Sequence, residues 1–240
     1  MKIVITGGAS GLGASITRAF AKEVSNTVCF TYNRSHQQAE QILKDHSNSI
    51  AIKCDFRNGE ERKQLTGSIR SFDPDVLINN AYSGTFLNAH FHKTSSEDFL
   101  TNFRDNIIPV IEITQAAIEC FRKKKQGRII TILTAALTNV PPMGSAVYIA
   151  GKAYLEKLTK VWAAENGRFN ISSNSVSPSF LRTDLTASFD ERIVSQMTES
   201  HPLKRLLTVE EVMESVLFLA KASPQLNGVD ILLNAAMNVK

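Results

Sequence analysis

The sequence has no membrane-length apolar run and no cysteine pair of the kind found in disulfides or zinc sites. No apolar stretch approaches the roughly 18 residues that a membrane span needs, and strand-like sequence begins at residue 2, which leaves no room for a secretory signal. The three cysteines, Cys29, Cys54 and Cys120, are far apart and form no Cys-x-x-Cys pair. We therefore expect buried reduced thiols, no metal site, no membrane association and a cytoplasmic location.

The sequence also has little excess charge of either sign and no segment with the composition of a linker. The net charge is +4, from 27 Lys and Arg against 23 Asp and Glu. This excess is too small and too dispersed to indicate nucleic-acid binding, although it would suit a phosphorylated ligand or an acidic partner. The 240 residues are 43% hydrophobic and 21% charged, with no repeat and no Pro/Gly/Ser-rich segment. We expect residues 1–240 to form a single domain.

Apolar strand-like runs alternate along the chain with segments of helical periodicity. This alternation predicts an α/β fold, a Rossmann-like doubly wound parallel sheet of about seven strands with helices on both faces. Ligands bind such sheets at the carboxyl ends of the strands. The expected strands are Lys2–Thr6, Thr27–Tyr32, Ser49–Cys54, Val76–Asn79, Arg128–Leu133, Ile171–Val176 and Asp230–Leu233.

A glycine-rich turn follows the first expected strand. The apolar run Ile3–Ile5 leads into residues 6–13, which read TGGASGLG, and helical periodicity begins there. Glycine lets a phosphate approach the backbone without a Cβ in the way, and the N-terminus of the following helix offers unpaired N–H groups. The turn is therefore predicted to hold a pyrophosphate.

The end of the second expected strand bears on the choice between NADPH and NADH. Enzymes that select NAD usually place Asp or Glu here, where a carboxylate would repel the 2′-phosphate of NADP. This chain has Tyr32, followed by Asn33, Arg34 and Ser35, which can contact a phosphate through donors and a guanidinium. NADPH is favoured; the alternative is that Arg34 and Ser35 lie in a solvated loop.

Tyr148 and Lys152 form the candidate proton-transfer pair. They are four residues apart in a segment with helical character after the fifth strand, so they share one face of a helix. A free tyrosine has a pKa of about 10, and a nearby cation favours the phenolate and lowers that pKa. Tyr148 can then act as general acid to a carbonyl oxygen whose carbon receives a hydride.

These segments, in this order, resemble the short-chain dehydrogenase/reductase family, and most closely its 3-oxoacyl-[acyl-carrier-protein] reductases. The similarity rests on the glycine turn 6–13, on Asn79-Asn80-Ala81 after the fourth strand, and on Tyr148-x-x-x-Lys152, and it covers nearly the whole chain. The resemblance implies that Asp55 and Phe56 flank the adenine and that Lys152 binds the nicotinamide ribose. The implied cofactor contacts are Thr6, Gly7, Ala9, Ser10, Gly11, Leu12, Gly13, Asn33, Arg34, Ser35, Asp55, Phe56, Asn79, Asn80, Ala81, Tyr148, Lys152, Pro178 and Thr183.

The predicted catalytic residues are Asn106, Thr134, Tyr148 and Lys152. The long helix expected from Ser95 to Cys120 should bend near Pro109, which lacks an N–H. The family has a kinked helix here with an Asn whose local carbonyl holds a water for proton relay, and Asn106 is the candidate for that role.

The family's catalytic serine is missing from its usual place. Counting back thirteen residues from Tyr148 gives Ala135, whereas aligning the fifth strand gives Thr134 and requires one extra residue in the loop 140–142. We predict Thr134, because a loop absorbs an insertion more readily than a strand does. If Ala135 is the equivalent, the oxygen-binding donor is lost. Tyr82, Ser179 and the pair 235–236 also replace family glycines, and 185–203 is the expected substrate lid.

The expected function is NADPH-dependent reduction of a small carbonyl compound, with a 3-oxoacyl thioester on an acyl carrier protein as a candidate substrate. The basic run 122–125 is either a docking surface for an acidic carrier protein or a solvated helix end. Two alternatives stay open: a non-catalytic NADPH-binding subunit, suggested by the lost family residues, and an NAD-dependent alcohol or sugar dehydrogenase, disfavoured by Tyr32. The resemblance further implies a homodimer or homotetramer.

Overall fold

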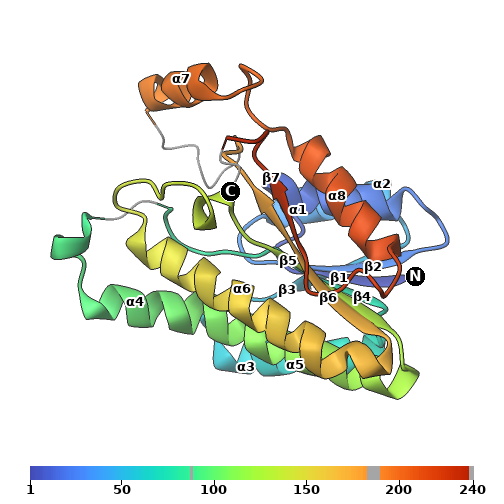
Figure 1. Ribbon diagram of the computed structural model, residues 1–240. Helices are drawn as coiled ribbons and strands as arrows, with labels where there is room; N and C mark the ends of the chain where they lie inside the picture. The colour runs from blue at the N-terminus through green and yellow to red at the C-terminus, as the bar shows by residue number, and fades with distance from the viewer. Residues whose placement is uncertain (87–88, 183–189, 238–240) are drawn as a thin grey trace.

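A parallel sheet of seven strands forms the centre of the molecule (Figure 1). The computed structural model describes residues 1–86, 89–182 and 190–237. The strand order is β3-β2-β1-β4-β5-β6-β7, and every neighbouring pair is parallel. All seven predicted strands are present, with ends shifted by two residues at most. They are β1 (Lys2–Ile5), β2 (Thr27–Tyr32), β3 (Ser49–Lys53), β4 (Val76–Asn79), β5 (Gly127–Ile132), β6 (Ile171–Pro178) and β7 (Asp230–Leu233).

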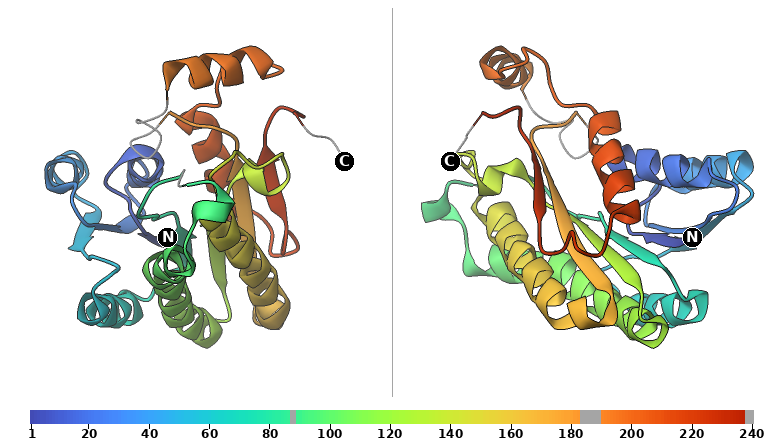
Figure 2. Two further views of the ribbon diagram at one scale, coloured as in Figure 1. Left: turned by 90° about the vertical axis from the view of Figure 1, so that its left-hand side faces the viewer. Right: turned by 45° about the vertical axis from the view of Figure 1, so that its right-hand side comes forward.

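Helices cover both faces of the sheet, as predicted (Figure 2). Side chains of α1, α2 and α8 share one apolar core with the sheet, and those of α3, α5 and α6 share the other. Each of these helices turns apolar residues inward at helical spacing, such as Ile16 and Phe20 of α1, which are almost wholly buried. The helices are α1 (Gly11–Ala21), α2 (His36–Asp45), α3 (Gly59–Phe72), α4 (Ser96–Asn102), α5 (Ile108–Lys124), α6 (Ala146–Asn166), α7 (Glu191–Ser200) and α8 (Val209–Lys221).

A π-helical turn, η2 (Phe103–Ile107), separates α4 from α5. Pro109 has no N–H to donate to the carbonyl of Asp105, so regular α-helical bonding fails at this point, and a π turn is one way of accommodating the failure. The long predicted helix is therefore interrupted where the sequence placed its bend. The turn brings Asn102 and Asn106, both buried, toward the segment that follows β4.

The direction in which successive strands are added to the sheet reverses between β1 and β4, which are neighbours in the sheet. Strands β2 and β3 lie on one side of this point and β5, β6 and β7 on the other, so a crevice forms at the carboxyl ends of β1 and β4. Helix α7 stands apart from the two helical layers (Figure 1). It belongs to the predicted lid, which is described from residue 190 onward.

The three cysteines are buried free thiols, as predicted. Burial raises the pKa of the Cys29 thiol to about 12, so it stays protonated and unreactive at neutral pH. None of the helices within the described ranges combines the length and the apolar character needed to cross a membrane.

Candidate active site

A cavity of about 1220 Å³ opens at the carboxyl ends of the strands. It lies where α/β sheets of this type bind ligands. Eighteen of the predicted site residues contribute to its lining: Gly7, Ala9, Ser10, Gly11, Leu12, Gly13, Asn33, Arg34, Ser35, Asp55, Phe56, Asn80, Ala81, Asn106, Thr134, Tyr148, Lys152 and Pro178. The structure thus brings together segments that are widely separated in the sequence.

The glycine turn after β1 forms a cradle beside the first turn of α1. Gly7 has a φ of +65°, and its N–H donates to the Thr31 hydroxyl at 3.0 Å. A Cβ on Gly13 would lie only 2.0 Å from the Gly7 carbonyl oxygen, so no larger residue fits there. Ser10 precedes α1 without capping it through its side chain, and the first turn carries no acidic residue. The N–H groups of that turn are therefore suited to a pyrophosphate.

Two predicted cofactor residues, Thr6 and Asn79, do not line the cavity. Both are buried behind its wall. The Thr6 hydroxyl accepts hydrogen bonds from the N–H groups of Asn80 and Ala81, at 2.9 and 3.0 Å, and the Asn79 amide donates to the Thr114 hydroxyl at 3.0 Å. These bonds tie the carboxyl ends of β1 and β4 to each other and to α5. A third predicted residue, Thr183, lies outside the described residues.

Near the ends of β2 and β3, two arginines line the cavity. Arg34 and Ser35 line it just before α2, whose first turn has no acidic residue and no side-chain cap from Ser35. Asp55 faces Arg57, whose Nε donates to its Oδ1 at 2.9 Å, and Asn33 also hydrogen-bonds it. The pairing with Arg57 holds the pKa of the Asp55 carboxyl well below its usual range.

The Asp55 carboxylate oxygens are paired with Arg57. The place of Asp55 beside the adenine stays a prediction. Arg57 also lines the cavity and was missed by the sequence analysis. The available signal was its position two residues after Asp55, a spacing that allows a side-chain ion pair across a turn.

Thr134 lies beside Tyr148. The phenol, 7% exposed near the start of α6, has the Thr134 side chain as a neighbour that favours its ionised form. Thr134 directly precedes the short 3₁₀ turn η3 (Ala135–Leu137), and its hydroxyl also accepts from the Ala136 N–H at 3.3 Å. Of the two residues considered at the family's serine position, it is Thr134 whose side chain reaches the phenol.

Lys152 is buried one helical turn beyond Tyr148. Its Nζ donates to the Ile132 carbonyl oxygen at 2.7 Å and lies 5.8 Å from the centre of the Tyr148 ring. Burial lowers the pKa of Lys152 to about 8. Burial also raises the pKa of the Tyr148 phenol, only partly opposed by the Thr134 side chain. The expectation of a lowered Tyr148 pKa is therefore wrong for this arrangement, because burial of the phenol raises the pKa.

The segment after β4 packs two aromatic rings against Tyr148. The ring centroids of Tyr82 and Phe86 lie 5.0 and 4.6 Å from that of Tyr148. Asn106 holds the backbone between them: its Oδ1 accepts from the Ser83 N–H at 2.7 Å, and its Nδ2 donates to the Ser83 carbonyl at 3.0 Å. The replacement of a family glycine by Tyr82 thus narrows the cavity beside the phenol.

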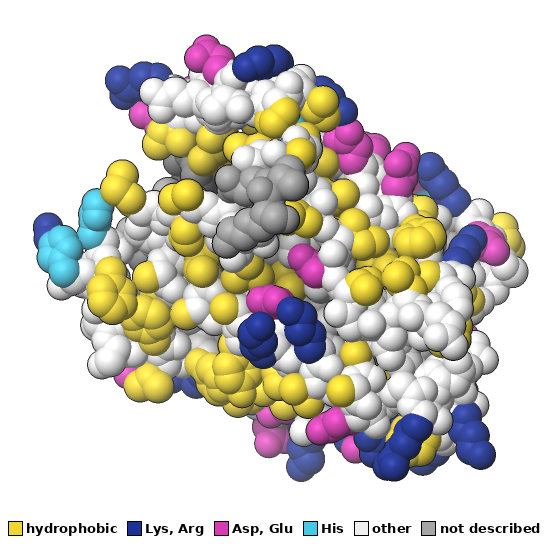
Figure 3. Space-filling view, in the orientation of Figure 1, with side chains coloured by type: hydrophobic (Ala, Val, Ile, Leu, Met, Phe, Trp, Pro, Cys, Tyr) yellow, Lys and Arg dark blue, Asp and Glu magenta, His cyan; other side chains and the backbone are white. Residues whose placement is uncertain are grey.

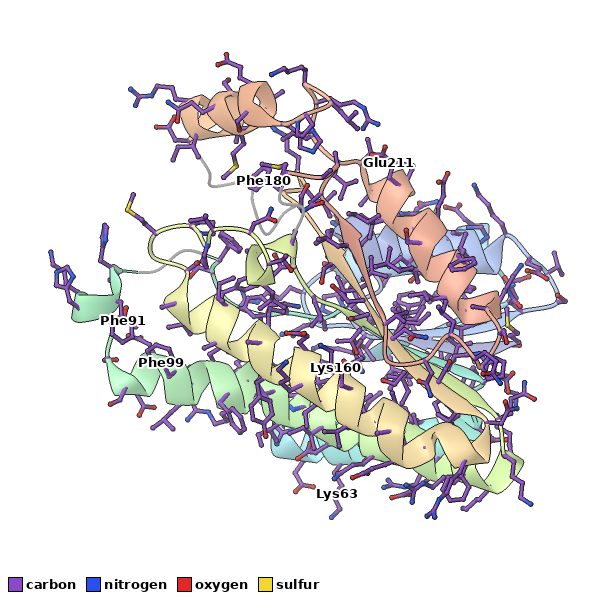
Figure 4. All side chains as sticks on the ribbon, viewed as in Figure 1. Lys63, Phe91, Phe99, Lys160, Phe180 and Glu211 are labelled. Carbon is purple, nitrogen blue, oxygen red and sulfur yellow. The ribbon has the colours of Figure 1, made fainter. Side chains whose placement is uncertain are left out.

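The wall of the cavity on the side of α7 is mostly apolar. Hydrophobic side chains gather beneath α7 in Figure 3, and Phe180 lies below that helix in Figure 4. His201, almost fully buried, adds a polar group to this wall, and its Nδ1 accepts from the Leu203 N–H at 3.2 Å. The apolar lining residues on this side are Val140, Pro142, Phe180, Leu181, Met197, Leu206 and Met237.

The basic run 122–125 lies away from the cavity. It ends α5 just before β5 begins, at the amino ends of the strands, whereas the cavity is at their carboxyl ends. The Lys124 ammonium donates to Asp75 Oδ1 at 2.8 Å, and Arg122 donates to Asn166 Oδ1 at 2.8 Å. This placement favours the helix-end interpretation of the run.

Comparisons with known proteins agree with the geometry. A family model described as Enoyl-(Acyl carrier protein) reductase matches residues 7–236. The 3-oxoacyl-[acyl-carrier-protein] reductase FabG of Chlamydia trachomatis is 28% identical over 222 residues, covering 90% of this chain and 88% of that protein. Oxidoreductase UcpA of Salmonella typhimurium is 28% identical over 228 residues, covering 90% and 86%.

Solved structures agree with these sequence matches. A short chain dehydrogenase/reductase family protein is 30% identical, with a TM-score of 0.85 and coverage of 98% of this chain and 96% of the other. A short chain dehydrogenase from Burkholderia cenocepacia, solved in complex with NADP, is 24% identical and shares the fold, with a TM-score of 0.85 and coverage of 99% and 97%. Since the matched span runs from the glycine turn past the last strand, the chain belongs to the short-chain dehydrogenase/reductase family of oxidoreductases.

Proposed function

We propose that this protein is an NADPH-dependent carbonyl reductase with Tyr148 as its general acid. The observation that carries the proposal is the presence of Thr134, Tyr148 and Lys152 in the lining of the same cavity as the glycine turn. A raised phenol pKa keeps the proton on Tyr148 at neutral pH, which is the state a general acid needs.

NADPH supplies a hydride when bound, and its proposed holders follow from the cavity wall. The glycine turn and the N-terminus of α1 would hold the pyrophosphate. Arg34 and Ser35 would hold the 2′-phosphate, and the pairing of Asp55 with Arg57 reduces the repulsion that a free carboxylate would cause. Lys152 and Pro178 would lie toward the nicotinamide end. The short chain dehydrogenase from Burkholderia cenocepacia, solved in complex with NADP, supports the same choice of cofactor.

The proton follows a short route among residues of this chain. The carbonyl carbon gains the hydride and the carbonyl oxygen takes the proton of Tyr148, which leaves a phenolate that is reprotonated from solvent. The Thr134 hydroxyl would orient the carbonyl oxygen beside the phenol. The Lys152 ammonium, 5.8 Å from the Tyr148 ring centre, favours the phenolate as it forms. The water-relay role of Asn106 stays a prediction.

The apolar wall beneath α7 supports an acyl compound as the substrate, since a chain of CH₂ groups is stabilised by an apolar lining. We therefore propose a 3-oxoacyl thioester, free or bound to an acyl carrier protein, as in the names of the relatives. We also propose that residues 1–240 act as one domain within a cytoplasmic homodimer or homotetramer.

The test is NADPH oxidation with a small 3-oxoacyl thioester, measured for the wild type, Tyr148→Phe and Thr134→Ala. We expect turnover by the wild type, none by Tyr148→Phe and a large loss in Thr134→Ala. A 2-enoyl thioester is assayed in parallel, because the matching family model is described as an enoyl reductase. Turnover of the enoyl substrate alone would contradict carbonyl reduction.

Cofactor binding, measured beside turnover, separates the two alternatives left by the sequence. A non-catalytic subunit would bind NADPH tightly and turn over neither substrate. An NAD-dependent alcohol or sugar dehydrogenase would bind NADH more tightly than NADPH, so the dissociation constants of both cofactors are measured first.

A further inference from the structure

The ammonium of Lys152 is buried without a carboxylate beside it. Its residue is only 6% exposed, and no ion pair within the described ranges includes it. A buried cation needs partners that replace water. The contacts that it makes are the Ile132 carbonyl oxygen at 2.7 Å and two aromatic rings, those of Tyr82 at 5.6 Å and Tyr148 at 5.8 Å from Nζ.

Tyr82 is held in this position from its other end. Its hydroxyl accepts a hydrogen bond of 2.9 Å from Asn102 Nδ2, and its ring meets that of Tyr148 at 82°, in a T-shaped arrangement. Asn102 can reach so far because residue 151 is glycine: a Cβ there would lie 2.6 Å from Asn102 Oδ1. Three segments distant in the sequence therefore fix one ring beside both proposed proton-transfer groups.

We propose that Tyr82 is a positioning residue, whose ring holds the Lys152 ammonium by a cation–π contact and keeps it beside Tyr148. The electron-rich ring face stabilises the charged form of Lys152 where no carboxylate does so. Without Tyr82, the only aromatic partner of the Lys152 ammonium would be the ring of Tyr148, the residue that gives up its proton in the proposed reaction. This inference rests on the proposed carbonyl reduction and adds a residue to its machinery.

The direct test is the pKa of Lys152, measured by NMR titration of protein labelled with ¹³C-lysine. The Lys152 resonance is the one missing from Lys152→Met. Tyr82 is replaced by Phe and by a series of increasingly fluorinated phenylalanines, which keep the ring's shape and weaken its electron-rich face. We expect the Lys152 pKa to fall progressively, by about one pH unit across the series.

The kinetic test compares Tyr82→Phe, Tyr82→Leu and Asn102→Leu. Tyr82→Leu should lower kcat about tenfold, the size of a lost desolvated cation–π contact, and shift the basic limb of the pH profile downward. Tyr82→Phe keeps the ring and should retain most of the wild-type kcat. The kcat of Asn102→Leu should lie between those of Tyr82→Phe and Tyr82→Leu. Tyr154→Leu is the matched control, because Tyr154 lies on the same helix as Lys152 and packs T-shaped on Phe103 at 5.2 Å.

Two results would overturn the proposal: a Lys152 pKa that is constant along the fluorinated series, or wild-type kcat and pH profile in Tyr82→Leu. The NMR titration needs neither cofactor nor substrate. It therefore gives its answer even if the proposed reduction is not observed, and the two inferences can fail separately.

Discussion

Lys152 donates a hydrogen bond of 2.7 Å to the carbonyl oxygen of Ile132, the last residue of β5. This bond ties α6 to the strand that leads into Thr134. The proposed general acid and the proposed orienting hydroxyl are thus held by adjoining parts of one frame, and a charged side chain is buried to build it. Burying that charge has consequences for stability and for the pH dependence of activity.

Lys152→Met should stabilise the protein at pH 7. The pKa of Lys152 is about 8 in the folded chain against an ordinary 10.5, so the unfolded state binds more protons between these pH values and stability rises with pH there. Burying the Lys152 charge destabilises the wild type by about 3 kcal/mol at most at pH 7. Lys152→Met removes this cost, but it also removes the hydrogen bond to Ile132, so the net gain in stability is smaller. Denaturant unfolding of both proteins at pH 7 and pH 10 measures it. If the difference in unfolding free energy between Lys152→Met and the wild type does not shrink from pH 7 to pH 10, Lys152 does not have the lowered pKa on which this prediction depends.

The kcat/KM for carbonyl reduction should decline as the pH rises through about 8, the pKa of Lys152. Loss of the ammonium proton removes the charge that favours the Tyr148 phenolate. The Tyr148 pKa is raised by burial, so its own ionisation contributes only at higher pH. Initial rates from pH 6 to pH 10 give the profile, and activity that stays constant to pH 10 would exclude Lys152 as the titrating group.

Thr134→Val should lower kcat by about 10²-fold, the usual loss on removing one donor at a reacting oxygen. Thr134→Ser keeps the hydroxyl beside Tyr148 and should retain most activity. Thr138→Val, at the end of the same 3₁₀ turn and outside the cavity lining, serves as the control. Equal losses in the Val and Ser variants would mean that the shape of residue 134 matters and its hydroxyl does not.

The sheet and the backbone of the site follow closely from local sequence. The bounds of β2 and β4 agree with their predicted ranges, because buried parallel strands are short apolar runs bounded by turn residues. The bounds of β7 agree as well, although its residues are half-buried or exposed. The glycine turn was predictable for a similar reason, since its close packing on α1 excludes a Cβ on Gly13.

Contacts between distant segments were not predictable from such patterns. The bond from Asn102 to Tyr82 joins residues 20 apart and depends on the π turn after α4. The direction of the Tyr148 pKa shift was also missed, because spacing along a helix reports the cation at Lys152 but does not report how completely both groups are desolvated.

Arg34→Ala should raise the dissociation constant of NADPH about 10- to 100-fold and leave that of NADH nearly unchanged, since a hydrogen bond to a charged group is typically worth about 1.5–3 kcal/mol. The reason is that Arg34 is the proposed partner of the 2′-phosphate, which NADH lacks. Lys44→Ala, an exposed cation in the last turn of α2, tests for a general effect of charge. Fluorescence titration measures both cofactors, and equal weakening of the two would remove Arg34 from the phosphate site.

Gly13→Ala and Gly67→Ala should change stability in opposite directions. A Cβ at residue 13 would lie 2.0 Å from the Gly7 carbonyl oxygen and 2.6 Å from Asn80 Nδ2, so the turn must move; we expect a loss of about 1–3 kcal/mol and of NADPH binding. A Cβ at residue 67, inside α3, meets nothing within 4 Å, and alanine there should add about 0.5–1 kcal/mol through its higher helix propensity. Urea unfolding and NADPH titration of both variants provide the measurement. Retention of wild-type stability and NADPH affinity by Gly13→Ala would show that the turn can open at little cost, which the close packing of Gly7, Gly13 and Asn80 argues against.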